Sequence, residues 1–187
     1  MKFTQVPKFV TLLFILLVIS CGKDDNCDII ICQNGGECVD GSCECPTGYT
    51  SGNCSEQIVP TSIKVKNIKV TRFPPTDGSG AGWDEGNGPD IFVGFGKDTI
   101  ILYQHPTNFE NASPLLEYDF VPVSELIIDF PNERHSLYLF DFDGVGTSVL
   151  MGGVVFDPYT STNKFPRVLT VDAGSTIAFE LSLEYSF

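Results

Sequence analysis

The last residues of the chain alternate between apolar and polar side chains. In the stretch STIAFELSLEYSF, every second position is apolar or aromatic: Ile177, Phe179, Leu181, Leu183, Tyr185 and Phe187. The positions between them are Ala178, Glu180, Ser182, Glu184 and Ser186. Because successive side chains of a strand point to opposite faces, this period of two predicts a strand with one buried face.

Residues 62–73, SIKVKNIKVTRF, alternate in two phases. Ile63 and Val65 share one phase, and Ile68 and Val70 share the other. A β-bulge near Asn67 would restore a common buried face, because it inserts one extra residue into one strand of a pair.

The remaining apolar runs are short and bounded by turn residues. Further strands are expected at 91–94, 99–103, 116–120, 125–130, 136–142, 153–156 and 168–171. No segment holds a helical apolar stripe for three turns. About eight strands within residues 61–187 therefore predict an all-β fold, an eight-stranded antiparallel β-sandwich.

The N-terminus has a different pattern. Lys2 and Lys8 give a basic start, and residues 9–19 are apolar apart from Thr11. That apolar run is too short to cross a hydrocarbon core of ~30 Å at ~1.5 Å per residue, so residues 1–20 are predicted to be a secretory signal peptide. The segment VISC, ending at Cys21, resembles the lipobox of bacterial lipoproteins. That resemblance implies lipidation of Cys21; the alternative is a plain signal peptide followed by an unremarkable cysteine.

Residues 21–26 then form an acidic tether. Its sequence GKDDN resembles the export signal of outer-membrane lipoproteins displayed on the cell surface. The resemblance implies an outer membrane lipoprotein that faces the cell exterior and contacts the membrane through its lipid anchor. The alternatives are a simple solvated tether and a periplasmic orientation.

Six of the seven cysteines fall within residues 27–54, so assigning Cys21 to lipid leaves an even number. So short a segment cannot bury a sufficient core, which indicates that covalent cross-links hold it together. Six cysteines allow fifteen pairings. A metal site is disfavoured, because the compartment is oxidising and the segment has no histidine.

The spacing C-x4-C-x5-C-x4-C-x-C-x8-C closely resembles an EGF-like domain. This resemblance implies the disulfides Cys27–Cys38, Cys32–Cys43 and Cys45–Cys54. Asp40-Gly41 is a good two-residue hairpin turn. Asp24, Asp25 and Asn26 match only half of the pattern of calcium-binding members, so we expect a module without calcium that acts as a spacer or contact surface.

Removing residues 1–20 takes away Lys2 and Lys8 but no acid, leaving 9 basic and 24 acidic residues and a net charge of −15. Such a chain repels nucleic acid and anionic bilayers, so no nucleic-acid partner is expected. Three lysines of one strand resemble the basic face that some lipid-binding domains carry: Lys64, Lys66 and Lys69. In a domain with 17 acids and 8 bases, we interpret them as solvated edge charges.

Residues 55–60 are expected to be a linker, and residues 73–90 form a long loop of glycine, proline and acid. Long loops of this kind in compact domains are functional or disordered. Asp84 lies six residues before Asp90, which precedes a strand. Asp141 and Asp143 end another strand, although aspartate is unfavourable in strands and costly to bury. These acids are either solvated loop residues or cation ligands.

A strand, an acidic loop with aspartates six apart, and the later stretch DFDGVGTSVLMGG together resemble a C2 domain. The resemblance implies that aspartates from two loops gather calcium at one end of the sandwich: Asp84, Asp90, Asp141 and Asp143. The family has a further aspartate at the position of Val149. Its absence implies one weakly held calcium, or a coordination shell completed by Asp77, Glu85, backbone carbonyls or water.

Trp83, the only tryptophan, precedes Asp84 in this loop. In membrane-binding C2 domains an apolar loop tip inserts into the bilayer, which makes Trp83 a candidate loop-tip contact. The alternative is ordinary packing against the end of the sandwich.

The sequence gives little support for catalysis. His105 and His135 are the only histidines, and there is no H-x-x-x-H or G-x-S-x-G motif. Paired carboxylates can hydrolyse glycosides, but their spacing here fits cation ligands better. We therefore expect a non-enzymatic module.

Two functions remain open. One is a binding or adhesion module for an extracellular protein, glycan or lipid. The other is a structural spacer lipoprotein that has lost metal binding. Convergence of the four aspartates would favour the first. Neutralisation of the cluster by Lys97 or Arg134 would favour the second.

Overall fold

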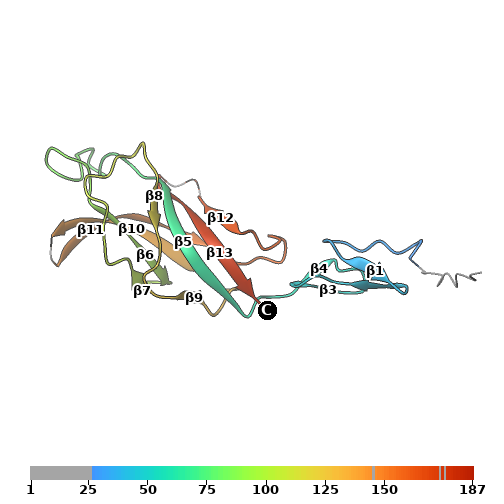
Figure 1. The fold of residues 1–187 in the computed structure, drawn as a ribbon. Coiled ribbons are helices and arrows are strands. Elements are labelled where there is room, and N and C mark those ends of the chain that lie inside the picture. Colours follow the sequence, from blue (N-terminus) through green and yellow to red (C-terminus); the bar gives the residue numbers. More distant parts are fainter. Residues whose placement is uncertain (1–26, 145, 173, 175) are drawn as a thin grey trace, which may run out of the picture.

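A computed structural model describes residues 27–187, apart from residues 145, 173 and 175. Within these residues the regular elements are the strands β1 to β13 (Figure 1). The described chain offers no helix with the length and apolarity needed to cross a bilayer. The predicted signal peptide at residues 1–20, the candidate lipidation site Cys21 and the tether at 21–26 lie outside the described residues.

The N-terminal module consists of two small hairpins. β1 (Glu37–Val39) pairs with β2 (Ser42–Glu44), and β3 (Tyr49–Thr50) pairs with β4 (Glu56–Gln57). Asp40 and Gly41 join the first pair with φ angles of 49° and 83°, as a two-residue hairpin turn requires. β4 lies inside the segment expected to be a linker, so the pairing of the module extends to Gln57.

Three disulfides hold this module together, and their pairing is the one that the EGF-like resemblance implies. They join Cys27 to Cys38, Cys32 to Cys43, and Cys45 to Cys54. In this module Cys54 is fully buried, whereas Ile29 and Ile31 are largely exposed. The cross-links thus replace the apolar core that so few residues cannot form.

The rest of the chain is a sandwich of two antiparallel sheets, as predicted. One sheet has the order β11-β10-β6-β7, and the other has the order β12-β13-β5, with β8 and β9 on the outer edge of β5. The strands of the first sheet are β6 (Ile91–Lys97), β7 (Ile100–Gln104), β10 (His135–Gly144) and β11 (Thr147–Phe156). Those of the second are β5 (Ser62–Arg72), β8 (Tyr118–Phe120), β9 (Leu126–Ile128), β12 (Val168–Val171) and β13 (Ala178–Ser186).

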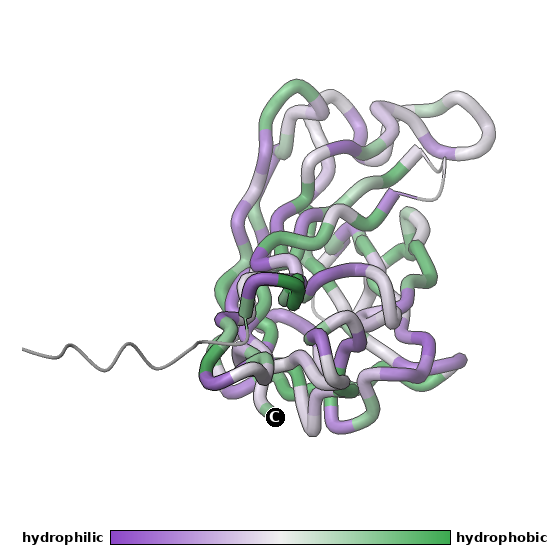
Figure 2. The backbone as a smooth tube through the Cα atoms, turned by 90° about the vertical axis from the view of Figure 1, so that its right-hand side faces the viewer, coloured by the Kyte–Doolittle hydropathy of each residue, from purple (hydrophilic) through white to green (hydrophobic). Residues whose placement is uncertain are grey.

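The core is built from the alternating apolar positions of strands from both sheets. Figure 2 shows hydrophobic and hydrophilic residues alternating along the backbone. The fully buried side chains of the core include Ile63, Phe95, Leu137, Phe179 and Leu181. Phe187 departs from the predicted buried face, because it lies beyond β13 and is 42% exposed.

The predicted bulge in β5 is confirmed. Ser182 of β13 pairs with Asn67, and Leu183 pairs with Val65, so Lys66 is the extra residue. This shift brings Ile63 and Val65 onto the same buried face as Ile68 and Val70. It therefore resolves the change of phase in the sequence.

The two modules meet at an aromatic junction. Gly48 has a φ of 91°, and a Cβ on it would lie 2.7 Å from ring atoms of Phe165 and of Phe187. The ring of Tyr49 packs edge-on against Phe165, with centroids 5.4 Å apart. Glycine is required at position 48, because its backbone conformation and its closeness to two rings both exclude a side chain.

Candidate functional site

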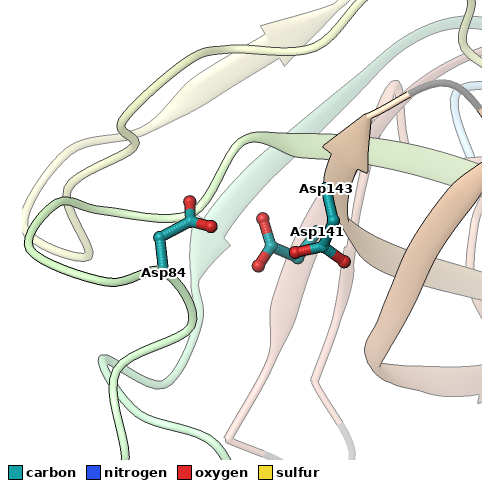
Figure 3. Close-up of side chains that lie close together, drawn as sticks. All are labelled: Asp84, Asp141 and Asp143. Carbon is teal, nitrogen blue, oxygen red and sulfur yellow. The ribbon is translucent and has the colours of Figure 1, made fainter.

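Three aspartates converge at the end of the sandwich farther from the N-terminal module (Figures 1 and 3). Asp141 and Asp143 come from the end of β10, and Asp84 comes from the loop 73–90. One carboxylate oxygen from each lies within 4.8 Å of those of the other two. In Figure 3 the carboxyl group of Asp84 points across a gap toward the other two.

The sheet register places Asp141 at the centre of this group. Asp141 pairs with Ile91 of the neighbouring strand β6, and the residue is only 1% exposed. Its Oδ1 atom accepts a hydrogen bond of 2.8 Å from the backbone N–H of Asp90. Its Oδ2 atom is buried and has no hydrogen-bond partner. Leaving a buried carboxylate oxygen without a partner is costly.

The surroundings disfavour ionisation of two members of the cluster. Burial is the main cause that raises the pKa of Asp141, and the nearby carboxylates of Asp84, Asp143 and Asp90 raise it further. Burial also raises the pKa of Asp84, with Asp90 and Asp143 adding to the effect. Because like charges repel, the group favours either protonation or a bound cation.

Asp90 lies beside the cluster, but its carboxylate holds a neighbouring segment and does not join the other aspartates as the calcium ligand that the C2 resemblance implied. Its Oδ1 atom accepts a hydrogen bond of 2.8 Å from the backbone N–H of Asn111, and its carboxylate is not one of the three that converge. Asp90 therefore ties the segment around Asn111 to β6 and supports Asp141 through its own N–H. The structure brings together Asp84, Asp141 and Asp143, with Asp90 beside them.

The other candidates for completing a coordination shell lie elsewhere. Asp77 caps a turn of its own loop, where Oδ1 accepts from Ser79 and from the N–H of Ala81. The hydrogen bond from the Ser79 side chain is the main cause that lowers the pKa of Asp77. Glu85 is exposed and outside the converging group. Val149 lies in β11 directly opposite Asp141.

Trp83 is engaged inside the loop. Its indole Nε1–H donates a hydrogen bond of 2.9 Å to the carbonyl of Pro74, and the residue is part-buried. This contact connects the middle of the loop to its start, next to Asp84. The geometry corresponds to packing at the end of the sandwich rather than to a free loop tip.

No basic side chain in the described part of the chain neutralises the cluster. Lys97 pairs with Glu133 and Arg134 pairs with Asp157, both toward the opposite end of the sheet. The register explains this distance, since Ile91 at the start of β6 lies beside Asp141 while Gly96 lies beside Ser136.

Comparisons with known proteins find a limited similarity to two proteins with EGF-like repeats. The human EGF-like repeat and discoidin I-like domain-containing protein 3 is 35% identical over 83 residues, which is 40% of this chain and 17% of that protein. Its mouse counterpart is 32% identical over 83 residues, with the same shares. The chain thus spans about a sixth of the length of these relatives. No protein-family profile matches the chain.

Among solved structures, a C2 domain aligns with 67% of this chain and 98% of its own length, at 13% identity and a TM-score of 0.45. The structure BON1-C2B aligns with 75% of this chain and all of its own, at 10% identity and a TM-score of 0.46. With its three disulfides, the N-terminal module of this chain is EGF-like.

Sequence reasoning missed Asn111 and its neighbour Asn87. The Nδ2 group of Asn87 donates to Oδ1 of Asn111, which adds a second link between the loop 73–90 and the segment held by Asp90. Both are polar loop residues in glycine-rich or proline-rich surroundings, and no spacing motif distinguishes them. Only the fold brings them together.

Proposed function

We propose that this chain is a non-enzymatic lipoprotein of the cell envelope, displayed on the outer surface. In this proposal it acts as a binding or adhesion module whose sandwich holds calcium at its loop end. The lipobox-like segment at Cys21 and the surface-export resemblance of the tether support the location. The EGF-like module and the carboxylate cluster support the binding role.

The observation that carries the calcium proposal is the state of Asp141. Its carboxylate is almost fully buried, one oxygen has no protein partner, and two other carboxylates face it. Such an arrangement lowers the stability of the fold unless a cation offsets the repulsion between the carboxylates and binds the unpartnered oxygen of Asp141.

The chemistry of the donors fits calcium. Calcium binds six to eight oxygen ligands at ~2.3–2.6 Å and tolerates irregular geometry, which suits carboxylates on loops. Asp84, Asp141 and Asp143 would hold the ion, with backbone carbonyls and water making up the shell. With Val149 opposite Asp141 and the Asp90 carboxylate bonded to Asn111, few carboxylates remain, so the site is weak.

Binding would have a structural consequence at this end of the sandwich. Asp84 belongs to the loop 73–90, whereas Asp141 and Asp143 belong to β10. A cation held by all three would link the loop to the sheet and remove the repulsion between them. The ordered loop end would then contact an extracellular protein, glycan or lipid.

The second candidate is a structural spacer lipoprotein that does not bind metal. Val149 and the hydrogen bond from Asn111 to Asp90 favour this alternative, because both reduce the number of available ligands. The two candidates differ in one measurable property, namely whether the cluster binds calcium.

Terbium luminescence tests the proposal directly, because Trp83 is adjacent to Asp84 and can sensitise a bound Tb³⁺ ion. On excitation of tryptophan in the full chain, we expect emission from bound terbium. Calcium should displace the terbium ion and reduce this emission, whereas the same concentration of magnesium should not. Asp141→Asn should abolish the emission. Asp129→Asn is the matched control, since Asp129 is an exposed aspartate toward the other end of the sandwich. Absent emission would favour the spacer alternative, and emission retained in Asp141→Asn would show that the ion binds elsewhere; either result would overturn the proposed calcium site.

A further inference from the structure

The basic residues of the sandwich are almost all neutralised. Six of its eight lysines and arginines form ion pairs: Lys64–Glu125, Lys66–Glu184, Lys69–Glu117, Arg72–Asp172, Lys97–Glu133 and Arg134–Asp157. Lys164 and Arg167 have no acidic partner among the described residues. In a chain with a formal net charge of −13, two neighbouring unpaired cations are unusual and raise the question of an anionic partner.

Arg167 lines a cavity at the junction of the two modules. The cavity has a volume of about 510 Å³. Its lining includes Thr47 of the EGF-like module together with Lys66, Phe165, Arg167, Tyr185 and Phe187 of the sandwich. Lys164 is not part of the lining. The cavity therefore combines two cations, the carboxylate of Glu184, the hydroxyl group of Thr47 and three aromatic rings, and only the fold brings Thr47 next to the others.

The aromatic wall of the cavity is held by mutual ring contacts. Phe165 packs edge-on against Phe187 at 5.0 Å and against Tyr185 at 5.4 Å. On its other sides it contacts Tyr49 at 5.4 Å and stacks with Tyr159 at 5.8 Å. Phe165 is thus fixed from both modules, which keeps the wall rigid before any ligand arrives.

The segment that carries Arg167 is also held in place, at a cost in backbone strain. Lys164 and Phe165 have φ angles of 57° and 50°, the left-handed region that residues other than glycine rarely adopt. Asn163 supports the turn by accepting the N–H of Phe165 at 3.3 Å. The hydroxyl of Tyr185 donates to the carbonyl of Pro166, and the carbonyl of Arg167 accepts the N–H of Leu183 at 2.8 Å. Strained segments that are held this firmly occur preferentially at functional sites.

We propose that this junction cavity binds an acidic saccharide, through a carboxylate on Arg167 and an apolar ring face on the aromatic wall. A guanidinium group matches a carboxylate with two parallel hydrogen bonds. A hexuronate residue combines a carboxylate, ring hydroxyls and an apolar face, and the lining supplies a partner for each. Glu184 beside Lys66 accepts from a saccharide hydroxyl, a role that a purely anionic ligand would not need.

This site is separate from the proposed calcium site and does not depend on it. The cavity lies at the junction of the modules, next to the start of β5, whereas the aspartate cluster lies beyond the other end of that strand. Binding of the saccharide should therefore persist in chelator, and failure of one proposal leaves the other intact.

The test measures binding of hexasaccharides of polygalacturonate, alginate and hyaluronan to the full chain, by calorimetry in chelator. We expect at least one of them to bind, and its carboxyl-reduced form to bind about tenfold more weakly, which corresponds to ~1.4 kcal/mol. Arg167→Ala should weaken binding by about tenfold as well. Lys164→Ala is the matched control, because it removes the neighbouring unpaired cation outside the cavity, and it should change the affinity by less than about twofold.

Four results would overturn the proposal. The first is that none of the three oligosaccharides binds at millimolar concentration. The second is equal weakening by Lys164→Ala and Arg167→Ala, which would indicate diffuse charge attraction. The third is unchanged affinity for the carboxyl-reduced form. The fourth is binding of a peptide with a free C-terminal carboxylate in preference to every saccharide. Circular dichroism of both variants checks that loss of binding does not reflect unfolding.

Discussion

Replacing Asp141 with asparagine should stabilise the metal-free protein and at the same time remove its response to calcium. The amide keeps an oxygen that accepts the N–H of Asp90, and its nitrogen replaces the unpartnered Oδ2 atom. That nitrogen donates toward the carboxylates of Asp84 and Asp143 instead of repelling them. The substitution thus removes a buried charge without opening a cavity.

The expected size of the effect follows from the buried, unpartnered oxygen. Leaving a buried acceptor unsatisfied costs ~1–3 kcal/mol, so Asp141→Asn in chelator should raise the free energy of unfolding by about that amount at neutral pH. For a protein of this size, each kcal/mol shifts the melting temperature by roughly 2–4 °C. With calcium at 1,000 times its dissociation constant, the wild type gains ~4.1 kcal/mol and the variant gains nothing. The order of stability should therefore reverse between chelator and calcium.

The pH dependence in chelator gives a second readout of the same cause. Burial raises the pKa of Asp141 in the folded state, so the folded protein binds more protons than the unfolded one as pH falls through this raised pKa. The metal-free wild type therefore becomes more stable relative to Asp141→Asn as the pH falls. The difference should vanish below the unfolded value of about 3.9.

Thermal melting monitored by circular dichroism measures all of these quantities. Asp129→Asn, which removes an exposed charge, should stay within about 0.5 kcal/mol of the wild type under every condition. If Asp141→Asn is less stable than the wild type in chelator, the carboxylate is not under strain. If it responds to calcium as the wild type does, the ion binds elsewhere. Either result would refute the reasoning.

Two further substitutions test the geometry. Val149 lies opposite Asp141 on the neighbouring strand, so Val149→Asp should tighten calcium binding by about tenfold, or ~1.4 kcal/mol. The added carboxylate should also lower the melting temperature in chelator. Calorimetry that shows an unchanged calcium affinity would contradict this placement of Val149. Gly48→Val should separate the modules, because its Cβ would lie 2.7 Å from the rings of Phe165 and Phe187, and small-angle scattering should show a larger radius of gyration. Gly52→Val is the control, since a Cβ there meets nothing within 4 Å. An unchanged radius of gyration for Gly48→Val would show that the junction does not fix the two modules relative to each other.

The sequence predicted the strands well because one-sided burial leaves a period of two. The change of phase between Val65 and Ile68 even located the bulge, which the structure places at Lys66. The edge of the second sheet was harder to foresee. β8 and β9 pair with successive parts of β5, so they act as one interrupted edge strand, and the segment between them contains Pro122, which cannot donate a ladder hydrogen bond.

The candidate site was predictable only in part. The resemblance to a C2 domain implied a cluster of Asp84, Asp90, Asp141 and Asp143, and the structure brings together the carboxylates of all of these except Asp90. The hydrogen bond from Asn111 to Asp90 was not predictable, since it joins loops whose contact depends on tertiary packing. The junction cavity was equally hidden, because Thr47 and Arg167 are distant in sequence and neither belongs to a motif.

The position of β5 has a mechanical consequence. This strand begins at the junction with the EGF-like module and ends where the acidic loop starts, so it runs the length of the sandwich (Figure 1). A pull between the proposed lipid anchor and a proposed partner held at the loops would therefore be directed along β5. Such a force would pass from end to end through the covalent backbone of β5, since this strand connects the linker to the acidic loop. The hydrogen bonds from β5 to β13 and to β8 and β9 lie across that direction, so the strand would transmit the load without first separating from its neighbours.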